Sequence, residues 1–214
     1  MPNPNRIEEA VDAALSPVQT AIVATVRTAY ATVATKYHNP EDGCDEQTFG
    51  YMVFKVTQHG ITVTAQDPAS GIIIEPDSLS FRFKIGGFRF GLYRLGQRAV
   101  DKIDETFPNN HNAAGELALD NVQYKFELGE EAYMPRALVI GHLGNWETGC
   151  EQIWVAEPLH ENGGAITGWG WTKALWRWDG REVLTLPQQP TLPAPTLVRP
   201  VVLKLKNIEE KPTG

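Results

Sequence analysis

The stretch SFRFKIGGFRFGLYRL, residues 80–95, alternates apolar and polar residues on both sides of a glycine pair. Gly86 and Gly87 can adopt the positive φ angles that a two-residue hairpin turn requires. Pairing the flanking residues across that turn places six apolar side chains on one face. They are Phe81, Phe83, Ile85, Phe88, Phe90 and Leu92. The sequence therefore predicts an antiparallel hairpin with one face in the core.

The opposite face of this hairpin carries Arg82, Lys84 and Arg89. Residues 50–98 hold six basic and three acidic residues, whereas residues 99–161 hold three basic and twelve acidic ones. Two interpretations follow. The basic face is the solvated side of a half-buried sheet, or it binds an anionic ligand or a partner.

Two helices are predicted before the hairpin, over residues 6–15 and 17–37. In the second, apolar residues recur at steps of three and four, which is the period of a helix with one buried stripe. The stripe consists of Ile22, Val26, Ala29, Tyr30, Val33 and Tyr37.

Strands are predicted for most of the remaining chain. Residues 51–65 alternate on both sides of His59-Gly60 and predict a second hairpin. Further strands are expected at 72–75, 121–129, 135–144 and 150–158, and a short helix near Val100, Ile103 and Phe107.

The expected architecture is an α+β fold, with N-terminal helices packed on a mostly antiparallel, meandering sheet. Residues 1–186 are expected to form a single α+β domain. Residues 187–214 begin with PQQPTLPAPTLVRP, which predicts a proline-rich extended C-terminal tail.

Composition limits the classes of partner. The 214 residues carry a formal net charge of −7, which argues against a surface devoted to nucleic acid or anionic membrane. The only cysteines are Cys44 and Cys150, too few for a disulfide framework, and no apolar run predicts a membrane span. A reducing, cytoplasmic location is expected.

Four of the six tryptophans lie within GWGWTKALWRWDG, residues 168–180. A hairpin that turns over residues 172–175 places Trp169, Trp171, Trp176 and Trp178 on one face. Such a face is either part of the core or a stacking surface for a ligand, and these four residues are candidate ligand-binding residues with Arg82, Lys84 and Arg89.

The segment GHLGNWETGCEQ, residues 141–152, contains residue types that hydrolases use. Candidate catalytic residues are His142, Asn145, Glu147 and Cys150, and Cys44 is an alternative nucleophile. The acidic neighbours of Cys44 oppose thiolate formation there. A metal site formed by His142, Glu147 and His160 lacks a recognised ligand spacing, and neither a metal nor another cofactor is expected.

Three functional hypotheses follow. The first is a non-catalytic binding or interaction module that takes a protein partner, a second copy of itself or an anionic ligand. The second is an intracellular hydrolase with its site around residues 142–150. The third, less favoured, is a nucleic-acid or anion binder that uses the basic hairpin.

Overall fold

The computed structural model describes residues 4–76, 80–97, 111–128, 134–160 and 166–178. The chain divides into two compact units, Met1–Leu184 and Thr185–Gly214. The second unit, and with it the predicted proline-rich tail, lies outside the described residues. The helix predicted near Val100, Ile103 and Phe107 also lies outside them.

The described strands form one six-stranded sheet in the order β1-β2-β3-β4-β5-β6. The strands are β1 (Ile73–Ile74), β2 (Arg82–Ile85), β3 (Phe88–Gly96), β4 (Ala137–Asn145), β5 (Gly149–His160) and β6 (Ile166–Arg177). Neighbours are antiparallel except β3 and β4, which are parallel. The predicted α+β class with a mostly antiparallel sheet is therefore confirmed.

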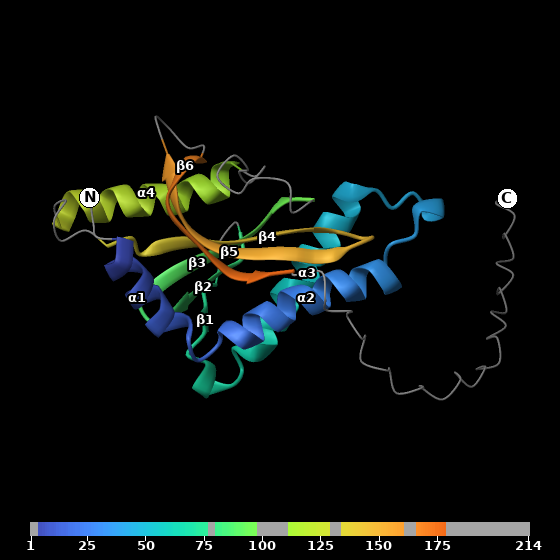
Figure 1. Ribbon diagram of the computed structural model, residues 1–214, viewed down its shortest axis with the longest axis horizontal. Coiled ribbons are helices and arrows are strands. Elements are labelled where there is room, and N and C mark those ends of the chain that lie inside the picture. The colour runs from blue at the N-terminus through green and yellow to red at the C-terminus, as the bar shows by residue number, and fades with distance from the viewer. Residues whose placement is uncertain (1–3, 77–79, 98–110, 129–133, 161–165, 179–214) are drawn as a thin grey trace, which may run out of the picture. The chain divides into compact units, whose positions relative to one another are not determined.

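Helices cover both faces of this sheet. Figure 1 shows α1 (Pro4–Leu15), α2 (Gln19–Lys36) and α3 (Glu46–Thr64) on one side and α4 (His111–Leu128) on the other. The first three helices share one apolar core with alternate residues of the strands. Leu117 of α4 belongs to a second core. Its other members include strand residues that point to the opposite face of the sheet, such as Val139 and Trp154.

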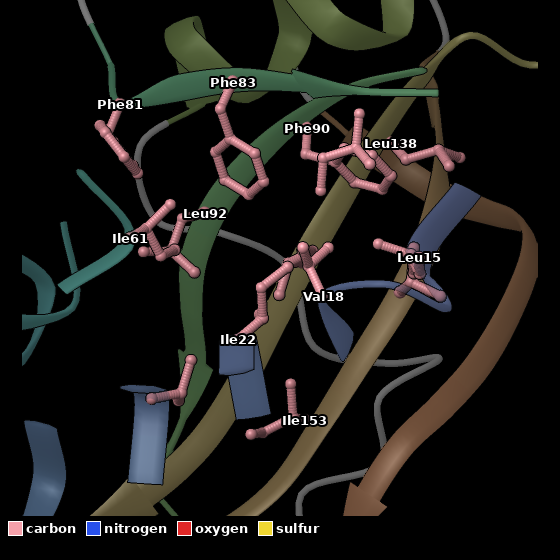
Figure 2. Packing of buried hydrophobic residues seen from close by; sticks show 14 of the residues in the cluster. Leu15, Val18, Ile22, Ile61, Phe81, Phe83, Phe90, Leu92, Leu138 and Ile153 are labelled. Atoms are coloured by element: carbon pink, nitrogen blue, oxygen red, sulfur yellow. The ribbon is translucent and has the colours of Figure 1, made fainter. Parts of the chain in front are cut away.

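The predicted hairpin is confirmed in its register, because Ile85 pairs with Phe88 and Phe83 with Phe90. Gly86 and Gly87 adopt φ angles of 56° and 88°. Figure 2 shows Phe81, Phe83, Phe90 and Leu92 on the core side of this hairpin, together with Ile22 and Ile61 from the helices.

The predicted hairpin over residues 51–65 is wrong, because this segment lies in α3. The buried positions are Phe49, Val53, Thr57 and Ile61, four residues apart. Asp45 caps the helix by accepting a hydrogen bond from the Thr48 amide at 2.8 Å. Gly60 is no turn residue: a Cβ there would lie 2.5 Å from Thr25 Cγ2, so glycine permits close packing of α2 and α3.

The strand predicted at 121–129 is also wrong, because residues up to Leu128 belong to α4. This helix lies in the connection between the parallel strands β3 and β4. Parallel neighbours need such a crossover, which usually contains a helix. The sheet is therefore covered on a second face that the prediction left exposed to solvent.

The predicted turn over residues 172–175 is wrong as well, because β6 continues through it. β6 pairs with β5 over its whole length, with register shifts between Ile153 and Trp154, Glu157 and Pro158, and Leu159 and His160. Residues 161–165, which stand between β5 and β6 in the sequence, lie outside the described residues.

Candidate functional site

The basic face of the β2–β3 hairpin contacts α4. Arg82 forms an ion pair with Glu116, and Arg89 forms one with Asp120. Both acidic residues lie on α4, one turn apart, so they meet two neighbouring strands. These two ion pairs join α4 to the hairpin, while Lys84 on the same face is about half exposed.

Glu75, which follows β1, is the second counter-charge for this face. Its carboxylate lies 2.9 Å from Lys84 Nζ and 3.0 Å from Arg89 Nε. Burial opposes ionisation of Glu75, but hydrogen bonds from Lys84 and Arg89 outweigh it and lower its pKa. Arg82, Lys84 and Arg89 therefore all have acidic partners within the chain, which removes the main support for an anion site.

We expect Arg89→Met to lower the free energy of unfolding by about 1–2 kcal/mol, because it removes hydrogen bonds to two carboxylates. The loss should concentrate in α4, whose amide protons should exchange faster. Hydrogen exchange and urea denaturation measure both effects. Arg6→Met, at an exposed position of α1, is the matched control. Equal exchange rates for α4 in the two variants would contradict this account of the helix.

A buried asparagine also holds α4 in place. Asn121 Oδ1 accepts hydrogen bonds from the amides of Arg136 and Ala137 at 3.0 and 2.9 Å. Its Nδ2 donates to the Ala137 carbonyl at 2.7 Å. These three bonds join the inner side of α4 to the start of β4, so the rotation of the helix about its axis is fixed.

Among the exposed residues of α4 are three apolar ones, Leu119, Val122 and Phe126, which we call the α4 stripe. Their side chains are 47%, 52% and 90% exposed. Leu117 and Asn121, which point to the sheet, are almost fully buried. An ordinary surface helix has one apolar face and one polar face, whereas α4 has apolar residues on both. The α4 stripe is thus a candidate interaction surface.

The sequence analysis missed the α4 stripe because two periods overlap in this segment. Val122, Tyr124 and Phe126 alternate with polar residues, which suggested a strand. Leu119, Val122 and Phe126 are spaced by three and four, which is the helical signal. The helical spacing is present in the sequence, but it outweighs the strand-like alternation only when the whole segment 111–128 is considered.

The candidate catalytic residue His142 lies on the opposite side of the sheet, within the core below α2 and α3. Its Nδ1 is 2.8 Å from the Tyr30 hydroxyl. Arg94 is its register partner on β3, and the positive charge of Arg94 acts on both the hydroxyl and the imidazole.

The electrostatic setting keeps these groups uncharged apart from Arg94. Burial lowers the pKa of His142 to about 3, and the positive charge of Arg94 adds to the shift. Burial likewise raises the pKa of the Tyr30 hydroxyl. His142 is neutral at physiological pH, and its Nδ1 is already bonded to Tyr30.

Arg94 joins the helices to the end of the sheet. Its guanidinium forms an ion pair with Glu46 at the start of α3 and donates to the Gly144 carbonyl at 2.6 Å. It also lies over the ring of Phe49, with Cζ 5.6 Å from the ring centroid. Phe49 is buried and packs against Tyr30. This arrangement positions α2 and α3; it does not expose a reactive group.

The two cysteines each have a backbone carbonyl as hydrogen-bond partner. Cys150 is buried, which raises the pKa of its thiol, and its Sγ lies 3.7 Å from the Gln152 carbonyl. The alternative thiol, Cys44, donates to the Tyr37 carbonyl at 3.4 Å. Neither of these hydrogen-bond partners is a histidine, although a cysteine nucleophile needs an adjacent base.

Asn145 and Glu147 belong to the β4–β5 turn. Asn145 Oδ1 accepts from the amides of Glu147 and Thr148 at 2.8 and 2.9 Å, and its Nδ2 donates to the Gln97 carbonyl at 3.0 Å. These bonds give Asn145 a turn-forming role. Glu147 is exposed.

The four clustered tryptophans are divided between the two faces of β6. Trp171 and Trp176 pack against the core under α1 to α3, and Arg27 lies over the Trp176 ring at 4.5 Å. Trp169 packs against the core under α4. Trp178 follows the strand and is 46% exposed. The expected single face of four indoles is wrong, because the turn it required does not exist.

The described residues contain neither a candidate membrane-spanning helix nor a candidate metal-binding cluster. No helix there is long and apolar enough to cross a membrane. No three histidine, cysteine, aspartate or glutamate side chains in that part of the chain lie close enough together to hold a metal ion. Comparison of the chain with protein-family models, with curated proteins and with solved structures found no match.

Proposed function

We propose that this chain is a protein-interaction module without chemistry of its own, and that the α4 stripe binds its partner. The observation that carries the proposal is the exposure of Leu119, Val122 and Phe126 on a helix whose inner side is fixed to the sheet. Exposed apolar groups of this kind mark interaction sites when they are contiguous. A reducing compartment such as the cytoplasm is part of the proposal, because both cysteines are free.

The geometry favours a protein partner over an anionic ligand or a nucleic acid. The three basic side chains that an anion would need are already bonded to Glu75, Glu116 and Asp120. Binding phosphates would require breaking these pairs, and each broken pair leaves a carboxylate facing the incoming anion. The α4 stripe needs no such rearrangement.

The hydrolase alternative receives less support from the same structure. A catalytic base has to reach the proton it removes, within about 3 Å or through one water. His142 is buried and bonded to Tyr30, and Cys150 has a raised pKa that disfavours the thiolate.

The test compares full-length chain immobilised as bait in three forms: wild type, Phe126→Ser and Tyr51→Ser. Tyr51 is a second aromatic residue on a helix surface, 59% exposed, and it lies on α3. The prey is a lysate of the expressing cells supplemented with labelled chain. We expect a protein that wild type and Tyr51→Ser retain and Phe126→Ser loses. Identical retention by wild type and Phe126→Ser, including none, overturns the proposal.

A further inference from the structure

We infer that α4 opens away from the sheet as a unit, under the control of its two ion pairs, while the core under α1 to α3 stays folded. The first reason is how little apolar surface α4 buries. Of its side chains that the structure describes, the buried ones belong to Leu117, Ala118 and Asn121. The buried side chains of α2 all belong to the first core: Ile22, Val26, Ala29, Tyr30 and Val33. Because burial of apolar surface is the main force that holds an element in place, α4 is held more weakly than α2.

Charged contacts supply much of what holds α4. Glu116 pairs with Arg82 and Asp120 pairs with Arg89, both between the helix and the hairpin. The side chain of Glu116 is 47% exposed and that of Asp120 is 30% exposed, so dissolved ions reach both pairs. Screening by salt weakens partly exposed ion pairs, whereas apolar contacts carry no charge to screen. Salt should therefore loosen α4 more than α2.

The sheet has support of its own when α4 leaves it. Leu138 and Ile140 of β4 belong to the first core, whereas Val139 between them belongs to the second. The strands are therefore held from the other side by α1 to α3. Because α4 lies between β3 and β4 in the chain, the open helix stays attached at both ends and closes again intramolecularly. Opening uncovers the second core, including Trp154.

The two ion pairs thus set how often the second core meets solvent. A higher salt concentration, or the loss of one carboxylate, weakens the pairs and shifts the population toward the open form. This opening concerns the inner side of α4, so it does not depend on a partner for the α4 stripe.

Thiol labelling tests the opening, in a Cys44→Ser background that removes the partly exposed thiol. Ala118→Cys places a thiol on the inner side of α4, at a position that is 1% exposed. Cys150, which is buried in the first core, is the control within the same chain. We expect an aromatic disulfide reagent to label the Ala118→Cys thiol at least about tenfold faster than Cys150. A common rate for the two thiols overturns the inference, because α4 would then open only when the whole domain unfolds.

Hydrogen exchange of the wild type tests the role of charge without any substitution. As NaCl rises from about 0.02 to 0.5 M, the amide protons of α4 should exchange about threefold faster or more, relative to those of α2. An equal response of the two helices to salt overturns the control by ion pairs.

A pair of variants on α4 assigns the effect to the contact with the hairpin. Asp120→Asn removes the partner of Arg89, so it should speed exchange in α4 at low salt and reduce the response to added salt. Glu127→Gln removes the same charge from the same helix, but Glu127 is exposed and bonded to Gln123 of α4 itself. It should leave both measurements near the wild-type values. Equal effects of the two variants overturn the assignment to the ion pairs.

Discussion

Phe90→Ala should lower the free energy of unfolding by about 3–5 kcal/mol, the range for truncating a buried phenylalanine. Phe90 is fully buried at the centre of the β2–β3 hairpin, with its ring centroid 5.7 Å from that of Phe83 and 6.3 Å from that of Phe88. The substitution loses the free energy gained by burying the aromatic ring away from water. It also leaves a cavity lined by residues of the strands and helices. Urea denaturation measures the loss.

Phe126→Ala is the matched control, because it makes the same chemical change at a side chain that is 90% exposed. It should change the free energy of unfolding by about 0.5 kcal/mol or less. Similar losses for Phe90→Ala and Phe126→Ala would mean that Phe126 is covered in solution by part of its own chain, which also contradicts the α4 stripe.

Acid should destabilise the wild type through His142. The folded state holds the pKa of this imidazole at about 3, whereas an unfolded histidine has a pKa of about 6.5. Because the folded pKa is depressed, the stabilising contribution is complete above about pH 6.5. It is lost as the pH falls toward 3, by about 1.4 kcal/mol per pH unit. Between pH 7.5 and 4.5 the loss from this group amounts to about 3 kcal/mol.

The comparison uses urea denaturation of wild type, His142→Asn and His59→Gln at both pH values. His142→Asn should be less stable at pH 7.5, since it removes the group that accepts from Tyr30, but its deficit should shrink at pH 4.5 because no proton enters at position 142. His59 is exposed, and His59→Gln should follow the wild-type profile. A constant deficit for His142→Asn at both pH values would show that His142 does not titrate with unfolding.

The sequence correctly predicted those elements in which apolar residues repeat with a single period, either that of a strand or that of a helix. The hairpin alternates from Phe81 to Leu92 around a glycine pair, and the predicted pairs Ile85–Phe88 and Phe83–Phe90 are observed. α3 was missed because Val53, Val56, Thr57 and Val63 have branched side chains, which favour strands when neighbours alternate. The segment is nevertheless helical, because its buried positions are four residues apart and pack within the core.

The candidate site depended on contacts between distant parts of the chain. Arg82 and Arg89 were identified as a charged face, but their partners Glu116 and Asp120 lie about 30 residues away in a segment interpreted as a loop and a strand. With α4 missing from the prediction, neither the neutralisation of that face nor the α4 stripe was foreseeable. His142 was selected for its chemistry, and the sequence could not show that it is buried with its Nδ1 bonded to Tyr30.

The irregular register of β6 has a consequence for how this protein avoids aggregation. β6 ends the sheet among the described strands, and a long edge strand is a template on which another chain can extend a sheet. Three register shifts interrupt its ladder, so an incoming strand would have to repeat the same irregularities to keep its hydrogen bonds. Lys173, held by Glu8 and Asp12 of α1 at 2.8 and 2.6 Å, adds a charge that a stacked sheet would have to bury. The edge is thereby a poor template for uncontrolled growth of the sheet.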